Sequence, residues 1–313
     1  MEVLVFSLKI VAPLFIMMAL GYLLSAVKII DKTFTDRVSK FVFKFAMPVL
    51  QMYNMYNSDL REDFDGKLVI TVCACVIGII LLAWFLVPRF VHERKKAGVM
   101  IQAAYRSNFL LFALYIMRSL FGEEALGLTS VMIAVATALF NFAAVVILSY
   151  FGEEKKMNIR KTLRNIALNP LILGTAAGIV LSLSRIKLGG IVEGVMEDIG
   201  NLVTPLMLIA LGGQFTVKSA RANAKYIAAC VLMRLIAAPV IMITIGILLG
   251  FRGPALGLIL AISCSPVAVS SFAMADQFKC DTALAGEAVV FTSAFSSLTI
   301  FAAVFILKYF ALI

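Results

Sequence analysis

The chain has 313 residues, of which 62% are hydrophobic and 15% charged, and its mean hydropathy is +1.01. These values exclude an ordinary soluble globular domain and indicate an integral membrane protein in contact with the lipid bilayer. The formal net charge is +10, but the basic residues lie in short segments between apolar runs, so we expect no nucleic-acid partner.

Ten apolar runs follow one another along the chain, each close to the ~20 residues that a helix needs to cross hydrocarbon. The runs are apolar on every side, unlike the alternating strands of a membrane barrel, so the predicted fold class is all-α. We predict membrane-spanning helices at 3–26, 38–56, 68–88, 97–120, 125–150, 168–184, 190–214, 225–250, 254–275 and 283–312.

The two halves of the chain resemble each other at an offset of 157 residues. Matching positions include Pro13-Leu14 with Pro170-Leu171, Gly21 with Gly178, Pro48 with Pro205 and Phe121 with Phe278. We interpret this as a duplication, with a first repeat at 1–152, a cytoplasmic linker at 153–167 and a second repeat at 168–313. Five spans in each half is an odd number, so the second copy must enter the bilayer from the opposite side, as in the inverted repeats of secondary transporters.

The basic residues predict the orientation. With both termini outside, the cytoplasmic segments hold 17 Lys or Arg and the outer segments hold seven. Cytoplasmic loops carry the excess of Lys and Arg in membrane proteins. We therefore expect a multi-pass protein of the cell membrane with both termini outside.

Two of the apolar runs are interrupted by polar residues. The ninth contains Ser265-Pro266-Val267, and proline removes a helical hydrogen bond there. The fourth contains Arg106-Ser107-Asn108, which lies about 13 Å into the membrane if the helix begins near Ala97. At the offset of 157, Asn108 matches Ser265. Polar breaks at equivalent positions of two inverted halves predict a binding site between them, and exposed half-helix N-termini favour an anion.

Two arginines fall deep within predicted helices. Arg106 and Arg234 have no acidic residue in the third, fourth, eighth or ninth span to pair with. Each can either cap backbone carbonyls of a kinked helix or supply charge to an anionic substrate, and Arg106 is the better candidate for the second role. Glu287, at the beginning of the tenth span, is expected to stabilise the N-terminus of that helix. Cys73 and Cys75 point apart on a helix, and we expect no metal or other cofactor.

Several longer motifs are similar to those of the auxin efflux carrier family. The run from Asn169 to Gly174, the run from Thr204 to Gly213, Arg234 to Pro239, and Ser265-Pro266 through Phe278 resemble its signatures, and the similarity covers essentially the whole chain. The short central loop is similar to that of bacterial members, which are usually assigned to malate, malonate or other carboxylates, whereas plant members export the auxin anion.

The resemblance implies a fold and a mechanism. The fold is ten helices in two inverted five-helix repeats, with broken helices 4 and 9 crossing. Helices 1, 2, 6 and 7 form a scaffold that dimerises, and an elevator motion carries helices 3–5 and 8–10 against it. The implied partners are thus a small organic carboxylate anion and a second copy of the chain.

Matched by motif, the family's crossover residues fall on Asn108 and Pro266, and its substrate-facing position in the second helix falls on Gln51. With their neighbours, the predicted substrate-binding set is Asn108, Ser107, Arg106, Gln51, Ser265, Pro266 and Val267. 

The chain also departs from the family pattern. Leu110, Ala113 and Tyr115 stand where the family has Gly and Pro after the crossover Asn, which predicts a weaker break in the fourth helix. The acidic residue of the third helix in plant members is absent, so the resemblance does not carry proton coupling over to this chain.

Two other functions compete with this one. A sodium-coupled symporter of the bile-acid type shares the crossed helices, but sodium needs hard oxygen ligands, and only Asn108, Ser265 and backbone carbonyls qualify here. An intramembrane enzyme is disfavoured because His92, the sole histidine, lies in a basic loop and no Gly-x-Ser-x-Gly nucleophile turn is present. We expect a transporter and not an enzyme.

Overall fold

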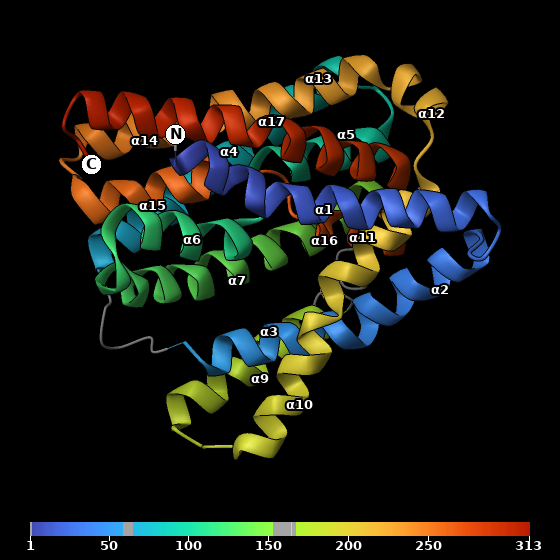
Figure 1. The fold of residues 1–313 in the computed structure, drawn as a ribbon, viewed down its shortest axis with the longest axis horizontal. Helices are drawn as coiled ribbons and strands as arrows, with labels where there is room; N and C mark the ends of the chain where they lie inside the picture. Colours follow the sequence, from blue (N-terminus) through green and yellow to red (C-terminus); the bar gives the residue numbers. More distant parts are fainter. Residues whose placement is uncertain (1, 59–64, 153–163, 165–166) are drawn as a thin grey trace.

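The computed structural model describes residues 2–58, 65–152, 164 and 167–313 (Figure 1). Within these ranges the regular structure is helical, and the one exception is an isolated antiparallel bridge between Ser107 and Val267. The predicted linker at 153–167 lies, except for residues 164 and 167, outside the described residues. The prediction of an all-helical membrane fold is confirmed.

The first half of the chain contains helices that follow the predicted runs closely. They are α1 (Glu2–Ala26), α2 (Lys32–Phe41), the π-helical η1 (Val42–Ala46), α3 (Met47–Tyr56), α4 (Gly66–Phe90), α5 (Arg94–Tyr105), α6 (Phe109–Phe121), the short η2 (Glu123–Ala125) and α7 (Leu126–Gly152). The helix predicted at 38–56 begins earlier in the structure, at Lys32. The side chain of Asp31 accepts a hydrogen bond from the N–H of Phe34 and caps the N-terminus there.

The second half of the chain is also helical. Its elements are α9 (Pro170–Ser184), α10 (Gly190–Asn201), α11 (Val203–Gln214), α12 (Val217–Ala222), α13 (Ala224–Leu232), the π-helical η3 (Met233–Ala237), α14 (Ala238–Leu248), α15 (Gly253–Cys264), α16 (Ser270–Gln277) and α17 (Thr282–Tyr309).

Five of the continuous helical segments in the described ranges are long and apolar enough to cross a membrane. They are Gly66–Phe90, Glu123–Gly152, Gly190–Gln214, Ala224–Leu248 and Thr282–Tyr309. Four shorter apolar helices, at Val11–Ala26, Phe109–Phe121, Pro170–Ser184 and Gly253–Cys264, fall in other predicted spans. The chain is therefore a multi-pass membrane protein.

The helices pack as two groups (Figure 1). Group I comprises α1–α3 and α9–α11, in which α1 packs along α11 and α3 along α9. Group II comprises α4–α7 and α13–α17, in which α5 packs on α4 and α7, and α15 on α6 and α14. Contacts of α1, α2 and α11 with α16 and α17 join the two groups.

Glycine sets the helix spacing within group I. A Cβ added to Gly21 of α1 would collide with the carbonyl of Ile209 on α11, and one added to Gly178 of α9 would collide with the carbonyl of Met52 on α3. Small residues allow such close approach of backbones in membranes, where lipid gives helices no hydrophobic reason to associate. The two contacts are related by the 157-residue offset, because 21 + 157 = 178 and 209 − 157 = 52. The sequence repeat therefore corresponds to a repeated packing contact.

Candidate functional site

The two broken helices meet at the centre of group II. Helix α5 ends at Tyr105 and α6 begins at Phe109, while α15 ends at Cys264 and α16 begins at Ser270. The connecting segments lie side by side: the N–H of Asn108 donates to the carbonyl of Pro266 at 2.7 Å, and the N–H of Ala268 donates to the carbonyl of Arg106 at 3.2 Å. The breaks predicted in the fourth and ninth spans are therefore both present, and they are paired.

The interruption of the fourth helix is complete, although its sequence predicts a weaker one. In an unbroken helix the N–H of Asn108 would bond the carbonyl of Ala104, but here it bonds Pro266 instead. Pro266 has no N–H of its own, so its segment also cannot continue a regular helix. The break thus depends on the partner segment and does not require Gly or Pro after Asn108.

The half-helices that enter the crossing, α5 and α15, are offset by 159 residues, whereas those that leave it, α6 and α16, begin 161 residues apart. Helix α5 runs from residue 94 to 105 and α15 from 253 to 264, so both ends differ by 159. The alignment of Asn108 with Ser265 at 157 is therefore shifted by two residues at the crossing.

Arg234 of η3 lies behind the crossing and is only 1% exposed. Its guanidinium donates to carbonyls at the C-terminal ends of both α5 and α15. The acceptors are Ser265 (2.8 Å), Tyr105 (3.1 Å), Ala104 (3.4 Å), Ile262 (2.5 Å) and Ser263 (3.0 Å). The C-terminus of a helix carries partial negative charge and unpaired carbonyls, which a cation stabilises. Of the two roles considered for Arg234, carbonyl capping is the one that the structure shows.

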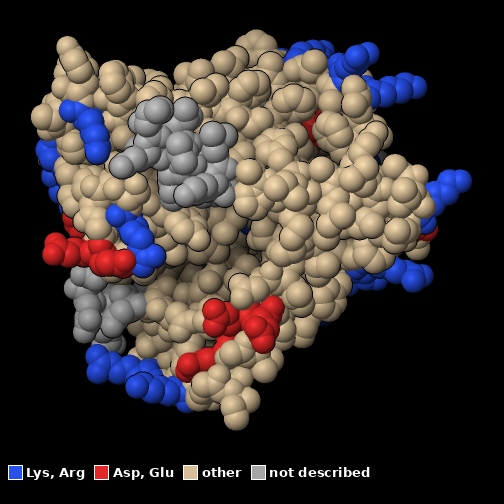
Figure 2. All heavy atoms as spheres, viewed as in Figure 1, with Lys and Arg blue, Asp and Glu red and all other residues tan. Residues whose placement is uncertain are grey.

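In front of the crossing lies a cavity of about 80 Å³. It is lined by the ends of the broken helices in group II, by α7, and by α3 and α11 of group I. Figure 2 shows this face of the molecule hollowed between the lower helices, which include α3, α9 and α10 in Figure 1, and those above. The side chains that give the cavity its polar character are Gln51, Arg106, Ser107, Asn108, Thr137, Asn141, Thr204 and Ser270.

Arg106 is 3% exposed and lies at the wall of this cavity. Its Nη1 donates to the carbonyl of Phe140 at 3.1 Å, and its Nη2 donates to Asn141 Oδ1 and Ser270 Oγ, both at 2.9 Å. These acceptors are all neutral, so they orient the guanidinium without cancelling its charge. The site therefore keeps a net positive centre in a region of low dielectric constant.

Several polar atoms around Arg106 are buried without a hydrogen-bond partner among the described residues. They are Arg106 Nε, Ser107 Oγ, Asn108 Nδ2, Asn141 Nδ2 and Gln51 Oε1. An unsatisfied buried polar group costs about 1–3 kcal/mol, so such groups normally have a ligand or water. Three of these atoms are N–H donors and one is a hydroxyl, while Gln51 Oε1 is the sole pure acceptor. This balance favours an anion that also carries a donor group.

The half-helix ends strengthen that preference. Helices α6 and α16 begin at Phe109 and Ser270, next to cavity-lining residues of both breaks. The first N–H groups of a helix have no intrahelical acceptor, and its N-terminus carries partial positive charge. Arg234 donates to the carbonyls at the opposite ends, so the helix ends that the crossing presents to the cavity are N-termini.

The predicted site residues divide into two sets. Arg106, Ser107, Asn108 and Gln51 line the cavity together. Ser265, Pro266 and Val267 are not part of its lining, and they shape the crossing instead. Ser265 Oγ donates to the carbonyl of Ala261 at 2.6 Å, Pro266 accepts from Asn108, and the N–H of Val267 donates to Thr292 Oγ1 at 3.1 Å.

Four polar lining residues are absent from the predicted site, and one of them is Thr204 of α11. Ser270 lies a few residues past the predicted break, and Thr137 and Asn141 come from α7. Asn141 is the sole amide in the apolar run 125–150, so a polar group stands there near the middle of a predicted span. The same reasoning that selected Asn108 in the fourth span applies to Asn141 in the fifth.

Comparison with known proteins finds one family model that matches nearly the whole chain. A family model described as membrane transport protein matches residues 6–304, which include every residue of the cavity and of the crossing. No curated protein matches the sequence.

Proposed function

The chain belongs to the auxin efflux carrier family of membrane transport proteins, and from this premise we propose that it carries small organic carboxylate anions across the cell membrane. The single observation that supports this function best is the cluster of unpaired donors around Arg106, since a carboxylate has the charge and the acceptor atoms that they lack. The substrate class is malate-like, malonate-like or auxin-like.

In this proposal the substrate carboxylate lies between Arg106 and the N-termini of α6 and α16. Asn108 and Asn141 donate to its oxygens, and Gln51 accepts from a hydroxyl or a protonated second carboxyl of the substrate. The excess of donors disfavours the sodium-coupled alternative at this position, because sodium needs oxygen ligands. The chemistry is binding and release, with no bond of the substrate broken.

We further propose the ten-span inverted repeat with both termini outside. Figure 1 shows the two termini at one end of the molecule, and the α1–α2 turn and α12 at the other. Figure 2 shows Lys and Arg spheres at both ends, and the assignment of the second end to the cytoplasm rests on the larger number of basic residues in those segments of the sequence. The repeated contacts of Gly21 and Gly178 support the duplication.

The mechanism that we propose is an elevator motion of group II against group I. Most polar groups of the cavity belong to group II, whereas Gln51 belongs to group I. Movement of group II would then take the anion with it and separate it from Gln51. The glycine contacts that fix the spacing within group I suit a static scaffold, which we expect to form a homodimer.

Reconstitution in proteoliposomes tests the function. Vesicles containing the purified protein should take up labelled malate, malonate or indole-3-acetate with saturable kinetics, and the label inside should be chemically unaltered. Protein-free vesicles should take up none of the three anions. Uptake that occurs only with a sodium gradient would favour the bile-acid type of symporter. Absence of uptake and exchange for all three anions would contradict the proposed substrate class.

A further inference from the structure

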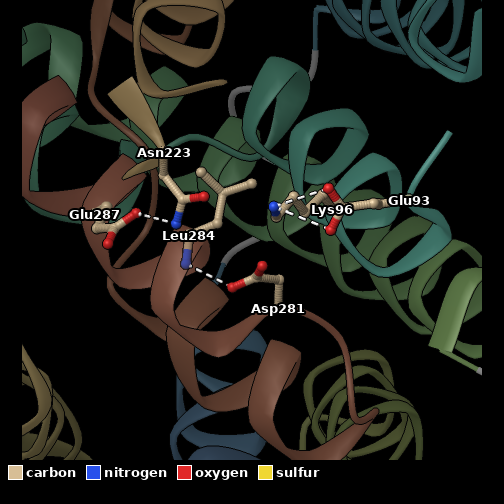
Figure 3. A network of polar contacts seen from close by, with 6 residues as sticks. All are labelled: Glu93, Lys96, Asn223, Asp281, Leu284 and Glu287. Atoms are coloured by element: carbon tan, nitrogen blue, oxygen red, sulfur yellow. Dashed lines mark hydrogen bonds and ion pairs between the residues drawn. The ribbon is translucent and has the colours of Figure 1, made fainter. Parts of the chain in front are cut away.

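A second buried charged site lies near the beginning of α17, at the end of the molecule that we assign to the cytoplasm. Among the Asp and Glu residues that the structure describes, Glu287 is the one that is buried, with 2% exposure. The sequence suggested that it stabilises the N-terminus of its helix, but that interpretation is wrong. Asp281 has this role, because its Oδ1 accepts the N–H of Leu284 at 2.9 Å (Figure 3). Glu287 lies further along the helix, about 8 Å from its start.

The groups around Glu287 leave the charge of its carboxylate uncompensated. Asn223, at the junction of α12 and α13, donates its Nδ2 to Glu287 Oε2 at 2.8 Å (Figure 3), and the hydroxyl of Ser219 on α12 also binds the carboxylate. Lys96 of α5 is the basic residue that faces this carboxylate, but its Nζ is bound 3.0 Å from the carboxylate of Glu93 (Figure 3). A buried carboxylate is strongly penalised unless a cation pairs with it. Among the described residues, one positive charge is therefore missing beside Glu287.

The carboxylate faces a separate cavity of about 60 Å³, and the polar groups that line this cavity carry oxygen. Carboxylate, hydroxyl and amide oxygens are the ligands that hard cations prefer. Glu287 is the one carboxylate among the described lining residues, and no His or Cys joins it there, whereas zinc and calcium sites use several such ligands. One negative charge and several neutral oxygens match a monovalent cation. The polar lining residues are Gln214, Thr216, Ser219, Thr282 and Glu287.

This cavity lies where the two groups of helices meet. Gln214 at the end of α11 belongs to group I, and its Nε2 donates to Thr35 Oγ1 on α2 at 2.8 Å. The amide oxygen of Gln214 is therefore the end of this side chain that is left to bind a cation. Thr282 and Glu287, on the other wall, belong to α17 of group II. A cation in the cavity would thus contact both groups at their cytoplasmic edge.

We propose that this cavity binds an alkali metal cation, sodium or potassium, with the Glu287 carboxylate as the charged ligand and Gln214 as the ligand from group I. The ion stays on the cytoplasmic side and does not cross the membrane with the anion. It stabilises the arrangement in which the two groups are in contact, because its ligands separate when group II moves. In a consequence that rests on the proposed transport function, the bound ion slows the elevator motion and must leave before group II can move.

Thermal unfolding of the purified protein tests ion binding without any substrate. At neutral pH and equal ionic strength, sodium or potassium chloride should raise the melting temperature in a saturable way above its value in choline chloride. Glu287→Gln should lose this shift, whereas Glu124→Gln, which alters an exposed carboxyl of η2, should keep it. Equal melting temperatures of the unmodified protein in all three salts would overturn the proposal, and so would a full shift in Glu287→Gln.

A second variant tests the site if Glu287→Gln does not fold. Gln214→Leu removes the ligand from group I and leaves the buried carboxylate in place. The salt concentration that gives half of the melting-temperature shift should therefore rise by about tenfold or more. An unchanged half-maximal concentration would overturn the bridge between the two groups.

Transport measures the consequence for the motion. Proteoliposomes with malate on both sides should exchange labelled malate more slowly in the salt that gives the larger melting-temperature shift than in choline chloride, and Glu287→Gln should exchange it equally fast in both. A salt-independent exchange rate in the unmodified protein would overturn the slowing of the motion. Absence of exchange in every salt, with the melting-temperature shift intact, would contradict the proposed substrate and support the ion site.

Discussion

Asn108 and Pro266, one from each half of the chain, are joined by a backbone hydrogen bond of 2.7 Å at the centre of the molecule. This bond replaces the helical bond that Asn108 loses at the break, and it fixes the positions of two half-helix N-termini relative to each other. Neither half of the chain can therefore form the polar centre alone. Arg234 also stabilises the crossing, because it donates hydrogen bonds to carbonyls that lose their helical partners at the two breaks.

Replacing Arg106 with Gln should weaken anion binding while the protein still folds. The substitution removes the positive charge but retains polar atoms near Asn141 and Ser270. We expect a loss of about 1.5–3 kcal/mol, or roughly 10- to 150-fold in affinity, with partial recovery in Arg106→Lys. Ligand-induced thermal stabilisation should be measured together with yield. Arg118→Gln, on the exposed surface of the same broken helix, is the control. Unchanged affinity in Arg106→Gln would contradict a binding role for the charge.

Asn141→Asp should prevent anions from binding at Arg106, because the new carboxylate would occupy the guanidinium. Asn141 Oδ1 already accepts from Arg106 Nη2 at 2.9 Å, so an aspartate at this position would pair directly with the guanidinium. The internal carboxylate would compete with an external one, and we expect anion affinity to fall at least as far as in Arg106→Gln. Thermal stability without ligand should be kept or raised, because a buried cation gains a partner. Asn201→Asp, on an exposed amide, should leave both quantities unchanged. Tight anion binding by Asn141→Asp would show that Arg106 does not contact the substrate.

Arg234→Met should destabilise the protein with or without ligand. The substitution leaves buried carbonyls of α5 and α15 without donors, at a cost of about 3 kcal/mol or more. Low yield and a reduced melting temperature in detergent are the expected results. Arg252→Met provides the comparison, since Arg252 also donates to carbonyls but is exposed. The capping role would be excluded by an Arg234→Met protein as stable as its parent.

Gly21→Ala and Gly178→Ala should lower stability by similar amounts. Each new Cβ would collide with a backbone carbonyl on the partner helix, and we expect a loss of about 1–3 kcal/mol for each. Gly194→Ala in α10 meets nothing within 4 Å and should be neutral or gain up to about 1 kcal/mol. Melting temperatures of the three variants test this. Equal stability for all of them would mean that group I is loosely packed.

Single cysteines at residues 252 and 218 should report opposite sides of the membrane. Both native residues are exposed, and they lie in segments assigned to the outside and to the cytoplasm. In a background without the five native cysteines, an impermeant maleimide added to intact cells should label position 252 and not position 218. The reverse pattern would invert the proposed orientation.

From the sequence we could predict the features that follow from the polarity of single residues, namely the apolar spans and the polar breaks within them. Arg106 and Asn108 stand out because a polar group inside an apolar run needs a partner, and Pro266 marks a break by its covalent structure. The direction of Ser265 could not be predicted, because a side chain beside a break turns toward the cavity or its own helix according to backbone angles. The partners of Arg234 and the burial of Glu287 depend on contacts between distant segments, which no local pattern contains.

The contacts of Gly21 and Gly178 bear on how this molecule can change over generations. At these two glycines the backbones of neighbouring helices are in direct contact, so no side chain can become smaller or larger without moving a helix. Substitutions accepted in group I must therefore leave these positions unchanged or be accompanied by a change in the partner helix. Residues around the cavity face no such geometric restriction, and one substitution there can alter which cargo fits. A lineage descended from this chain should therefore diversify fastest around its pocket while its framework stays nearly unchanged.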